Sequence, residues 1–205
     1  MFSPRDQDAV LSALGDKFLA AQLAAVNGAR EDIAWLQTER PGWFPNMAQR
    51  TLANLIHDRM WDRMSTILDG ESGVELVDRE PLRQIHVGVN LQIRLKRHSL
   101  DDLIATYETP GALAFWAQGA ATLPGLEEVS LAAGYHWITD ERRIGPAVIT
   151  YREGKNNPIW SVELNDSGGD ASGSAPVSWK PIDLPDLPSI GRALDDDKEE
   201  GGASS

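Results

Sequence analysis

Asp140, Glu153 and Lys155 have the residue types of a metal-dependent nuclease site, which combines an aspartate with a Glu-x-Lys pair. In such a site two carboxylates converge on a divalent metal, and the lysine positions the attacking water. Glu153 and Lys155, however, flank Gly154 and lead directly into Asn156-Asn157-Pro158, a sequence typical of a hairpin turn. We therefore expect a turn and no metal site here, and keep the nuclease as an alternative.

Arg94, Lys96 and Arg97 form the only basic cluster in an expected regular element. On the polar face of a strand, such side chains could contact phosphates. A solvated strand face, on which a lysine discourages edge-to-edge pairing, explains them equally simply. Because the chain carries a net charge of −12, nucleic-acid binding through this face is possible but not favoured.

Two groups of apolar residues are candidates for contact with a partner protein. Trp43 and Phe44 lie in a loop between two prolines, where aromatic side chains can meet a partner. Near the C-terminus, apolar residues alternate with prolines and acids, in a segment that would order either against a partner or against the body of the protein. The candidates in that segment are Trp179, Ile182, Leu184 and Leu187.

Two histidines complete the candidate chemical groups. His57, beside Asp58, offers a general base or a single metal ligand, and His136 lies in an expected strand. Neither has a second ligand at a recognised spacing, so we interpret both as packing or edge residues. The absence of cysteine excludes thiolate chemistry, and no phosphate-binding or hydrolase motif is present. We expect no cofactor, and we lean towards a protein that is not an enzyme.

The N-terminal third of the chain is expected to be helical. Ser3-Pro4 has the types of an N-cap and a first helical residue, and apolar residues then recur at three- and four-residue steps. Asn27-Gly28 is a typical helix stop, so a separate short helix is expected over residues 30–38. After two prolines, a third amphipathic helix is expected over residues 46–68.

Strands are expected in the second half of the chain. Every odd position from 85 to 95 is aliphatic, and every even position from 86 to 96 is polar or glycine. This period of two predicts one long strand over residues 85–96, with one buried and one polar face. Turn sequences separate further expected strands over residues 129–139, 145–152 and 159–164. Short helices are expected over residues 99–105 and after Pro110.

These elements predict an α+β fold, in which N-terminal helices pack on a mainly antiparallel sheet of four or more strands. Residues 1–164 would form a single domain, helical over 1–69 and with the sheet over 74–164. Residues 165–205 would form a disordered acidic tail with an apolar segment over 177–194. From residue 166 onward there are 9 Asp and Glu against 3 Lys and Arg.

Membrane association is not expected from the sequence. No apolar run approaches the roughly 20 residues that cross a bilayer. The first residues lack the basic and apolar regions of a secretory signal. We therefore expect a cytoplasmic protein, and the sequence leaves its oligomeric state open.

Several packing and turn sequences lie between residues 85 and 164, and they are Leu113-Ala114-Phe115-Trp116, Leu123-Pro124-Gly125, Ala133-Gly134-Tyr135, Ile144-Gly145 and Trp160-Ser161-Val162-Glu163-Leu164. In them this stretch resembles a group of uncharacterised bacterial proteins. Those proteins tend to be encoded beside helix-turn-helix or metallopeptidase-like regulators. The resemblance implies a toxin–antitoxin or phage-related setting, and it supplies no catalytic residue. We therefore expect a regulatory protein that acts through protein contacts, with the nucleic-acid binder or nuclease as the alternative.

Overall fold

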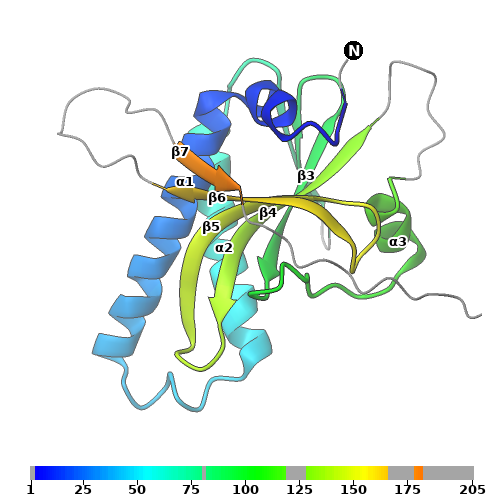
Figure 1. The fold of residues 1–205 in the computed structure, drawn as a ribbon. Coiled ribbons are helices and arrows are strands. Elements are labelled where there is room, and N and C mark those ends of the chain that lie inside the picture. Colours follow the sequence, from blue (N-terminus) through cyan, green and yellow to red (C-terminus); the bar gives the residue numbers. More distant parts are fainter. Residues whose placement is uncertain (1–2, 80–81, 119–127, 166–177, 182–205) are drawn as a thin grey trace, which may run out of the picture.

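Two helices, α1 (Gln7–Glu39) and α2 (Gln49–Leu68), cover one face of a seven-stranded sheet (Figure 1). The computed structural model describes residues 3–79, 82–118, 128–165 and 178–181. The strands lie side by side in chain order, and all neighbours are antiparallel except the parallel pair β3 and β4. The predicted α+β class is therefore confirmed. The strands are β1 (Val74–Arg79), β2 (Leu82–Val87), β3 (Leu91–His98), β4 (Val129–Ile138), β5 (Arg143–Arg152), β6 (Pro158–Asn165) and β7 (Ser178–Pro181).

α1 continues through the helix stop that the sequence predicts at Asn27-Gly28, so that prediction is wrong. Packing explains the difference, because a Cβ atom on Gly28 would lie 2.2 Å from Nε of Arg63 in α2. The glycine leaves room for the Arg63 side chain against α1 and does not end this helix. The helix expected over residues 30–38 is the C-terminal part of α1, while the helix expected over residues 46–68 corresponds to α2.

α1 begins later than the Ser3-Pro4 pattern predicts and is broken near its start. Asp6 is its N-cap, and Gly15 has a φ of 78°, outside the helical region. Figure 1 shows the residues before this break turned away from the axis of the longer part. The sequence predicted no apolar run long enough to cross a membrane, but α1 contains an 18-residue window with a mean hydropathy of 1.4, which is enough for a membrane span. Of that window, 56 % is buried inside the protein. The break and the burial are consistent with the core helix of a soluble protein.

The single long strand predicted over residues 85–96 is a hairpin of two strands, β2 and β3. Residues 88–90 form the turn, and Val89 at its tip is 88 % exposed. Ile85 pairs with Ile93 across the turn. Because paired positions differ by an even number of residues, the odd positions share one buried face in both strands. The alternation therefore identifies the faces correctly, although it continues unbroken through the turn and conceals it.

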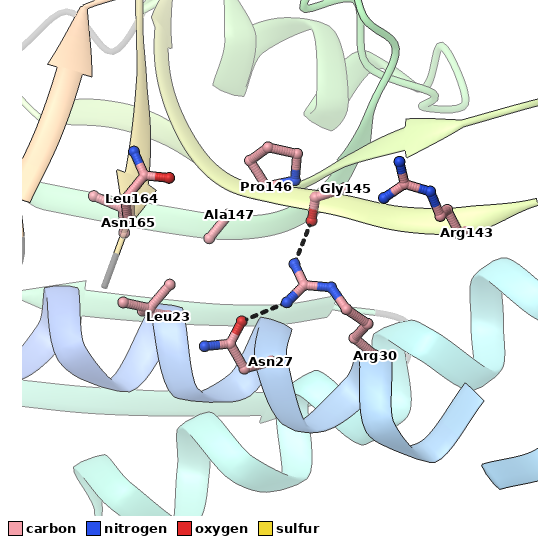
Figure 2. A pocket seen from close by; sticks show the side chains of 9 residues that line it. All are labelled: Leu23, Asn27, Arg30, Arg143, Gly145, Pro146, Ala147, Leu164 and Asn165. Atoms are coloured by element: carbon pink, nitrogen blue, oxygen red, sulfur yellow. Dashed lines mark hydrogen bonds between the residues drawn. The ribbon is translucent and has the colours of Figure 1, made fainter. Parts of the chain in front are cut away.

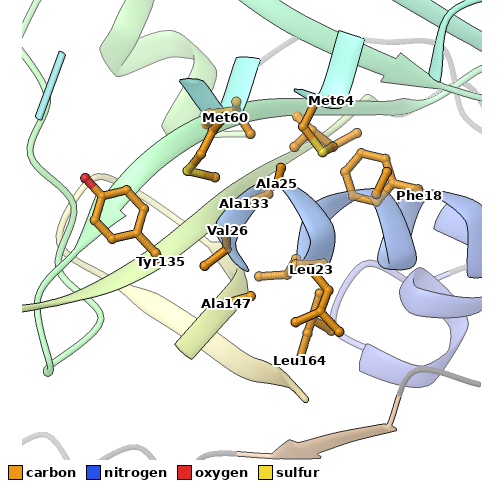
Figure 3. Packing of buried hydrophobic residues seen from close by; sticks show 14 of the residues in the cluster. Phe18, Leu23, Ala25, Val26, Met60, Met64, Ala133, Tyr135, Ala147 and Leu164 are labelled. Carbon is orange, nitrogen blue, oxygen red and sulfur yellow. The ribbon is translucent and has the colours of Figure 1, made fainter. Parts of the chain in front are cut away.

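The main core lies between the two helices and the odd-numbered face of β2 and β3, continued by β4, β5 and β6 (Figure 3). Each large side chain buried there contributes about 1.5–3 kcal/mol relative to its exposed state. The labelled members in Figure 3 are Phe18, Leu23, Ala25 and Val26 of α1, Met60 and Met64 of α2, and Ala133, Tyr135, Ala147 and Leu164 of the strands.

The chain from residue 99 to 118 covers part of the opposite face of the sheet. No helix forms over residues 99–105, contrary to the prediction. Instead, the Ser99 hydroxyl accepts a hydrogen bond from Leu103 N at 3.1 Å, and Ile104 forms a β-bridge with His98. The next expected helix is present as α3 (Pro110–Trp116), which packs Trp116 in a second, smaller apolar cluster.

The predicted tail contributes one described strand. β7 pairs with β6 along its four residues, so this part of the apolar segment orders against the body of the protein. The side chain of Trp179 and all of Ile182, Leu184 and Leu187 lie outside the described residues, as does the rest of the predicted disordered tail.

Candidate ligand-binding groove

A groove opens beside β3 where this strand loses a neighbour. β3 pairs with β4 along its whole length, but on its other side β2 pairs with residues 91–93 only, and Ile104 bridges His98. None of the described residues pairs as a strand with residues 94–97 on that side. α2 and the segment from residue 105 to 112 form the walls of the groove, whose volume is about 810 Å³.

The groove is basic, although the protein as a whole is acidic. Arg50 of α2 and Lys96 and Arg97 of β3 line it together. Among the described residues that line it, none is an aspartate or a glutamate. A hollow with charges of one sign and partly apolar walls concentrates ions of the opposite sign. The groove is therefore suited to an anionic ligand.

The ammonium group of Lys96 has no hydrogen-bond or ion-pair partner among the residues that the structure describes. Burial, together with the like charge of Arg94, lowers the pKa of Lys96 to about 8. A partly buried cation without a counterion is unfavourable, and an anion in the groove would stabilise its charged form. Lys96 is thus the residue of the groove that most requires a ligand.

Two further side chains offer uncharged polar groups to the groove. Tyr135 of β4 lines it, and Figure 3 shows the hydroxyl turned away from the apolar side chains of the core. Burial raises the pKa of Tyr135, so the hydroxyl remains a donor at neutral pH. On the α2 side, burial and the charge of Arg83 lower the pKa of His57, which keeps its imidazole neutral near pH 7. Both groups can hydrogen-bond to a bound anion.

Arg97 is held in place by contacts with α2 and with β4. Its guanidinium donates a hydrogen bond of 3.5 Å to Oε1 of Gln49 in α2, and it lies 5.9 Å from the centre of the Trp137 ring. A cation over an aromatic face is attracted to the ring. These contacts leave part of the guanidinium free to meet a ligand and orient it towards the groove.

A second polar cluster lies close by, and most of its groups are buried and contact one another. Glu163 is partly exposed, and Nδ1 of His98 and Nε of Arg152 have no hydrogen-bond partner among the described residues. His136 Nε2 lies 2.7 Å from Asp102 Oδ1, and His136 Nδ1 lies 3.2 Å from Glu163 Oε1, so that both ring nitrogens face carboxylate oxygens, which accept hydrogen bonds. Burial opposes a charge on this ring, but the two carboxylates outweigh burial and raise the pKa of His136. An imidazole that donates from both nitrogens is protonated, so we interpret His136 as a buried cation.

The other histidine of this cluster has the opposite character. Burial, reinforced by the charges of Arg152 and His136, holds the pKa of His98 well below its usual value. The Thr150 hydroxyl accepts a hydrogen bond of 2.8 Å from Arg152 and lies 3.2 Å from Nε2 of His98, to which it can donate. Arg152 also donates to the carbonyl of Asp102 at 2.8 Å. The cluster therefore fixes the segment after β3 to the sheet.

The sealed cluster does not form a catalytic triad. A triad needs one histidine that bridges a hydroxyl and a carboxylate. Here His98 contacts the hydroxyl of Thr150, whereas His136 contacts the carboxylates, and the two ring centres lie 6.2 Å apart. All these groups except Glu163 are buried. We interpret the cluster as a support for the groove wall that begins at residue 105.

The structure separates the residues of the predicted nuclease site. Asp140 lies in the β4–β5 turn and Glu153 in the β5–β6 turn, so the ten residues of β5 lie between them, roughly 30 Å of strand. Glu153 accepts hydrogen bonds from Arg5 at 2.9 and 3.0 Å, and Lys155 pairs with Glu108 at 3.0 Å. Within the described part of the chain, no group of three acidic or histidine residues is placed to hold a metal ion. Asp140, Glu153 and Lys155 therefore do not come together as a metal site in the described part of the chain.

Only two of the three residues of the predicted basic face lie together in the groove. Lys96 and Arg97 meet in the groove with Arg50, which the sequence did not indicate. Arg94 does not line the groove, because its guanidinium lies 3.7 Å from the centre of the Phe115 ring and donates to Gln84 Oε1 at 3.3 Å. Arg94 thus acts on the groove only through its charge, by lowering the pKa of Lys96.

The two aromatic residues proposed for partner contact have different environments. Trp43 is 64 % exposed, with Arg40 over its ring, and remains available to a partner. Phe44 is only 8 % exposed and belongs to the main core, with the guanidinium of Arg142 5.1 Å from its ring centre. Phe44 is therefore a packing residue and not part of an exposed contact surface.

A smaller hollow of about 280 Å³ lies between α1 and β5, and it also contains cations (Figure 2). Here Arg30 donates to the carbonyl of Gly145 at 2.7 Å and to Oδ1 of Asn27 at 2.7 Å, and Arg143 pairs with Glu141. Because the protein itself supplies acceptors to both cations, this hollow gives no indication of an anionic ligand.

Arg50 and His57 reach the groove from α2, and Tyr135 reaches it from β4. Both elements lie far from Lys96 in the chain, so no local sequence pattern joins these residues to it. Comparisons of the chain with protein-family models, with curated proteins and with solved structures found no match.

Proposed function

We propose that this protein is a regulatory binding protein, and that its basic groove takes an extended acidic segment of a partner protein. The observation that carries the proposal is the Lys96 ammonium, which is partly buried without a counterion among the described residues, in a groove that Arg50 and Arg97 also line. A carboxylate of the partner would supply that counterion and accept charge-assisted hydrogen bonds.

The shape of the groove supports an extended ligand. Residues 94–97 have no strand partner within the described chain on the groove side, so the backbone groups of alternate residues that point away from β4 are open to a further strand. A peptide can add to such an edge as a further strand, with backbone hydrogen bonds for affinity and alternate side chains for specificity. Acidic side chains on one face of that strand would lie against the basic lining.

This role agrees with the cellular setting that the sequence resemblance implies. The partner would be the second member of a toxin–antitoxin or phage-defence cassette in a bacterial cytoplasm. Trp43, exposed at 64 %, would extend the contact beyond the groove. In this proposal the protein acts by holding its partner and performs no chemical step.

Peptide binding measured by fluorescence anisotropy tests the proposal. The probe is a labelled ten-residue peptide of alternating glutamate and threonine, and a second peptide carries glutamine in place of glutamate. We expect the full chain to bind the acidic peptide, with an affinity that falls as the salt concentration rises. Lys96→Gln should lower this affinity about tenfold or more, as expected for the loss of a buried charge pair. Equal binding of the two peptides would overturn the proposal.

Arg79→Gln is the matched control for this measurement. It removes the same charge from an exposed position on β1, outside the groove. If the groove is the site, Arg79→Gln changes the affinity less than twofold. Similar losses in Lys96→Gln and Arg79→Gln would show that only net charge matters.

A single-stranded nucleic acid is the second candidate ligand, and Tyr107 favours it. This side chain is 77 % exposed on the groove wall, where it could stack on a base while Lys96 and Arg97 contact phosphates. A labelled single-stranded DNA of twelve nucleotides, tested in the same way, decides between the two. Tight binding that falls in Tyr107→Ala as well as in Lys96→Gln would favour the nucleic acid.

A further inference from the structure

We propose that the acidic C-terminal segment of the same chain, residues 182–205, occupies the basic groove and competes there with the partner. This inference rests on the proposed function, since it assigns a built-in competitor to the same site. It joins the two charged features of the protein, which the sequence places almost 90 residues apart.

Charge complementarity is the first argument. Residues 182–205 carry seven Asp and Glu against two Lys and Arg, and five of the acids lie within the six residues from Asp195 to Glu200. The groove offers three cations and no carboxylate among the described residues that line it. Opposite potentials on two surfaces favour their association and act against like-charged alternatives.

The position of β7 is the second argument. Leu95 pairs with Ala133, Ala133 with Ile149, Ile149 with Val162, and Val162 with Pro181. The last residue of β7 therefore lies in the same row across the sheet as the residue next to Lys96. Four strand spacings separate them, about 19 Å in all. The acidic segment thus starts level with the groove.

Chain length is the third argument. An extended chain covers up to about 3.3–3.6 Å per residue, so roughly six residues cross the distance from Pro181 to β3. The first acid of the dense run, Asp195, lies 14 residues beyond Pro181, which leaves enough chain to pass around the sheet. A segment attached in this way reaches an effective concentration of about the millimolar range. Even a weak site would then be occupied.

The decisive measurement compares the acidic peptide on two full-length chains. In one the tail is unchanged, and in the other its dense acids are neutralised by Asp195→Asn, Asp196→Asn, Asp197→Asn, Glu199→Gln and Glu200→Gln. If the tail competes, neutralisation strengthens peptide binding by about tenfold, the effect of removing a tethered competitor. Equal affinities for the two chains would overturn the inference.

A matched control separates competition from net charge. It neutralises five exposed acids of the body, by Asp8→Asn, Glu31→Gln, Glu39→Gln, Asp69→Asn and Glu75→Gln. We expect a change below twofold, and a tenfold gain in this control would also overturn the inference. If the peptide binds neither the unchanged chain nor the tail-neutralised chain, the proposed function itself fails, so the two failures are distinguishable.

A distance measurement reports on the contact directly. The chain has no cysteine, so spin labels attach only to Ala105→Cys on the groove wall and Ala193→Cys in the tail. At low salt we expect a population of short distances, which is lost in about 1 M salt, where screening is strong, and in Lys96→Gln. A distance distribution that neither salt nor Lys96→Gln changes would contradict the contact.

Discussion

β3 carries two polar environments, which differ in whether other protein groups pair with the charges in them. Lys96 and His98 lie two residues apart on this strand. The side chain of His98 is within 3.2 Å of the Thr150 hydroxyl in a sealed cluster, whereas the ammonium of Lys96 faces an open groove and has no counterion among the described residues. Residue type alone would rank the histidines, with an aspartate and a threonine nearby, above a lone lysine as a functional site.

The comparison shows that partners distinguish the two regions better than residue types do. In the sealed cluster, Asp102 and Glu163 meet the charge of His136, and protein oxygens meet Arg152. A buried network in which protein oxygens meet the cations stabilises a conformation, although His98 Nδ1 and Arg152 Nε have no hydrogen-bond partner among the described residues. In the groove the unmet charge of Lys96 has a free-energy cost that a ligand would relieve. We therefore interpret the sealed cluster as structural support and propose the groove as the binding site.

The largest expected effect is on the sealed cluster. Asp102→Ala leaves the charge of His136 less well paired and places alanine at a φ of 56°, a left-handed conformation. We expect a loss of about 3–5 kcal/mol in the free energy of unfolding, measured with urea at pH 7. Asp102→Asn, which tolerates that backbone and keeps an acceptor, should lose clearly less. A loss below about 1 kcal/mol in Asp102→Ala would show that the network is not structural.

The pH dependence of the cluster gives the next effect. Because the folded-state pKa of His136 is raised, its stabilisation is complete below the unfolded value of 6.5 and is lost as the pH rises through the folded pKa. We expect the free energy of unfolding of the wild type to exceed that of His136→Gln by about 2 kcal/mol at pH 6, and by less at high pH. Urea unfolding across this range measures the gap, and a gap that grows with pH would contradict the assignment.

In the groove, we expect removal of a charged side chain to raise the free energy of unfolding, opposite to its effect in the sealed cluster. The pKa of Lys96 is about 8 in the fold against an ordinary 10.5, so its charge opposes folding at neutral pH. Lys96→Met should therefore stabilise the fold by about 1 kcal/mol at pH 7, while it weakens peptide binding. As the pH rises from 8 to 10.5, the wild type releases its proton on folding and gains stability, so the advantage of methionine should vanish. A lower free energy of unfolding in Lys96→Met than in the wild type would show that this lysine stabilises the fold.

The smallest effect concerns Tyr135, whose hydroxyl lies at the boundary between core and groove. Tyr135→Phe keeps the buried ring and removes a hydroxyl for which the described residues provide no acceptor. We expect the free energy of unfolding to change by less than about 0.5 kcal/mol and peptide affinity to fall by about two- to fivefold. A larger loss of stability than of affinity would assign the hydroxyl to the core.

How far sequence reasoning reaches is clear from residues 85–96. Their alternation correctly assigned the odd positions within β2 and β3 to a buried face, but it concealed the turn at residues 88–90, where Val89 is exposed, because an even register keeps the period of two across a hairpin. In the same way, Gly28 has the type of a helix stop and is in fact a close contact with Arg63. Local patterns specify which side of an element is apolar, and they do not specify what the other side meets.

The sequence by itself determined the α+β class, a helix over residues 46–68 that corresponds to α2, the strands β4 to β6 to within a few residues, and the basic character of the stretch from Arg94 to Arg97. Only the tertiary structure decided that Lys96 and Arg97 share a groove with Arg50, that Asp140 and Glu153 lie at opposite ends of β5, and that His98 and His136 are buried. The physical reason is that periodicity depends on neighbours along the chain. Whether a charge is paired depends on groups brought together by folding.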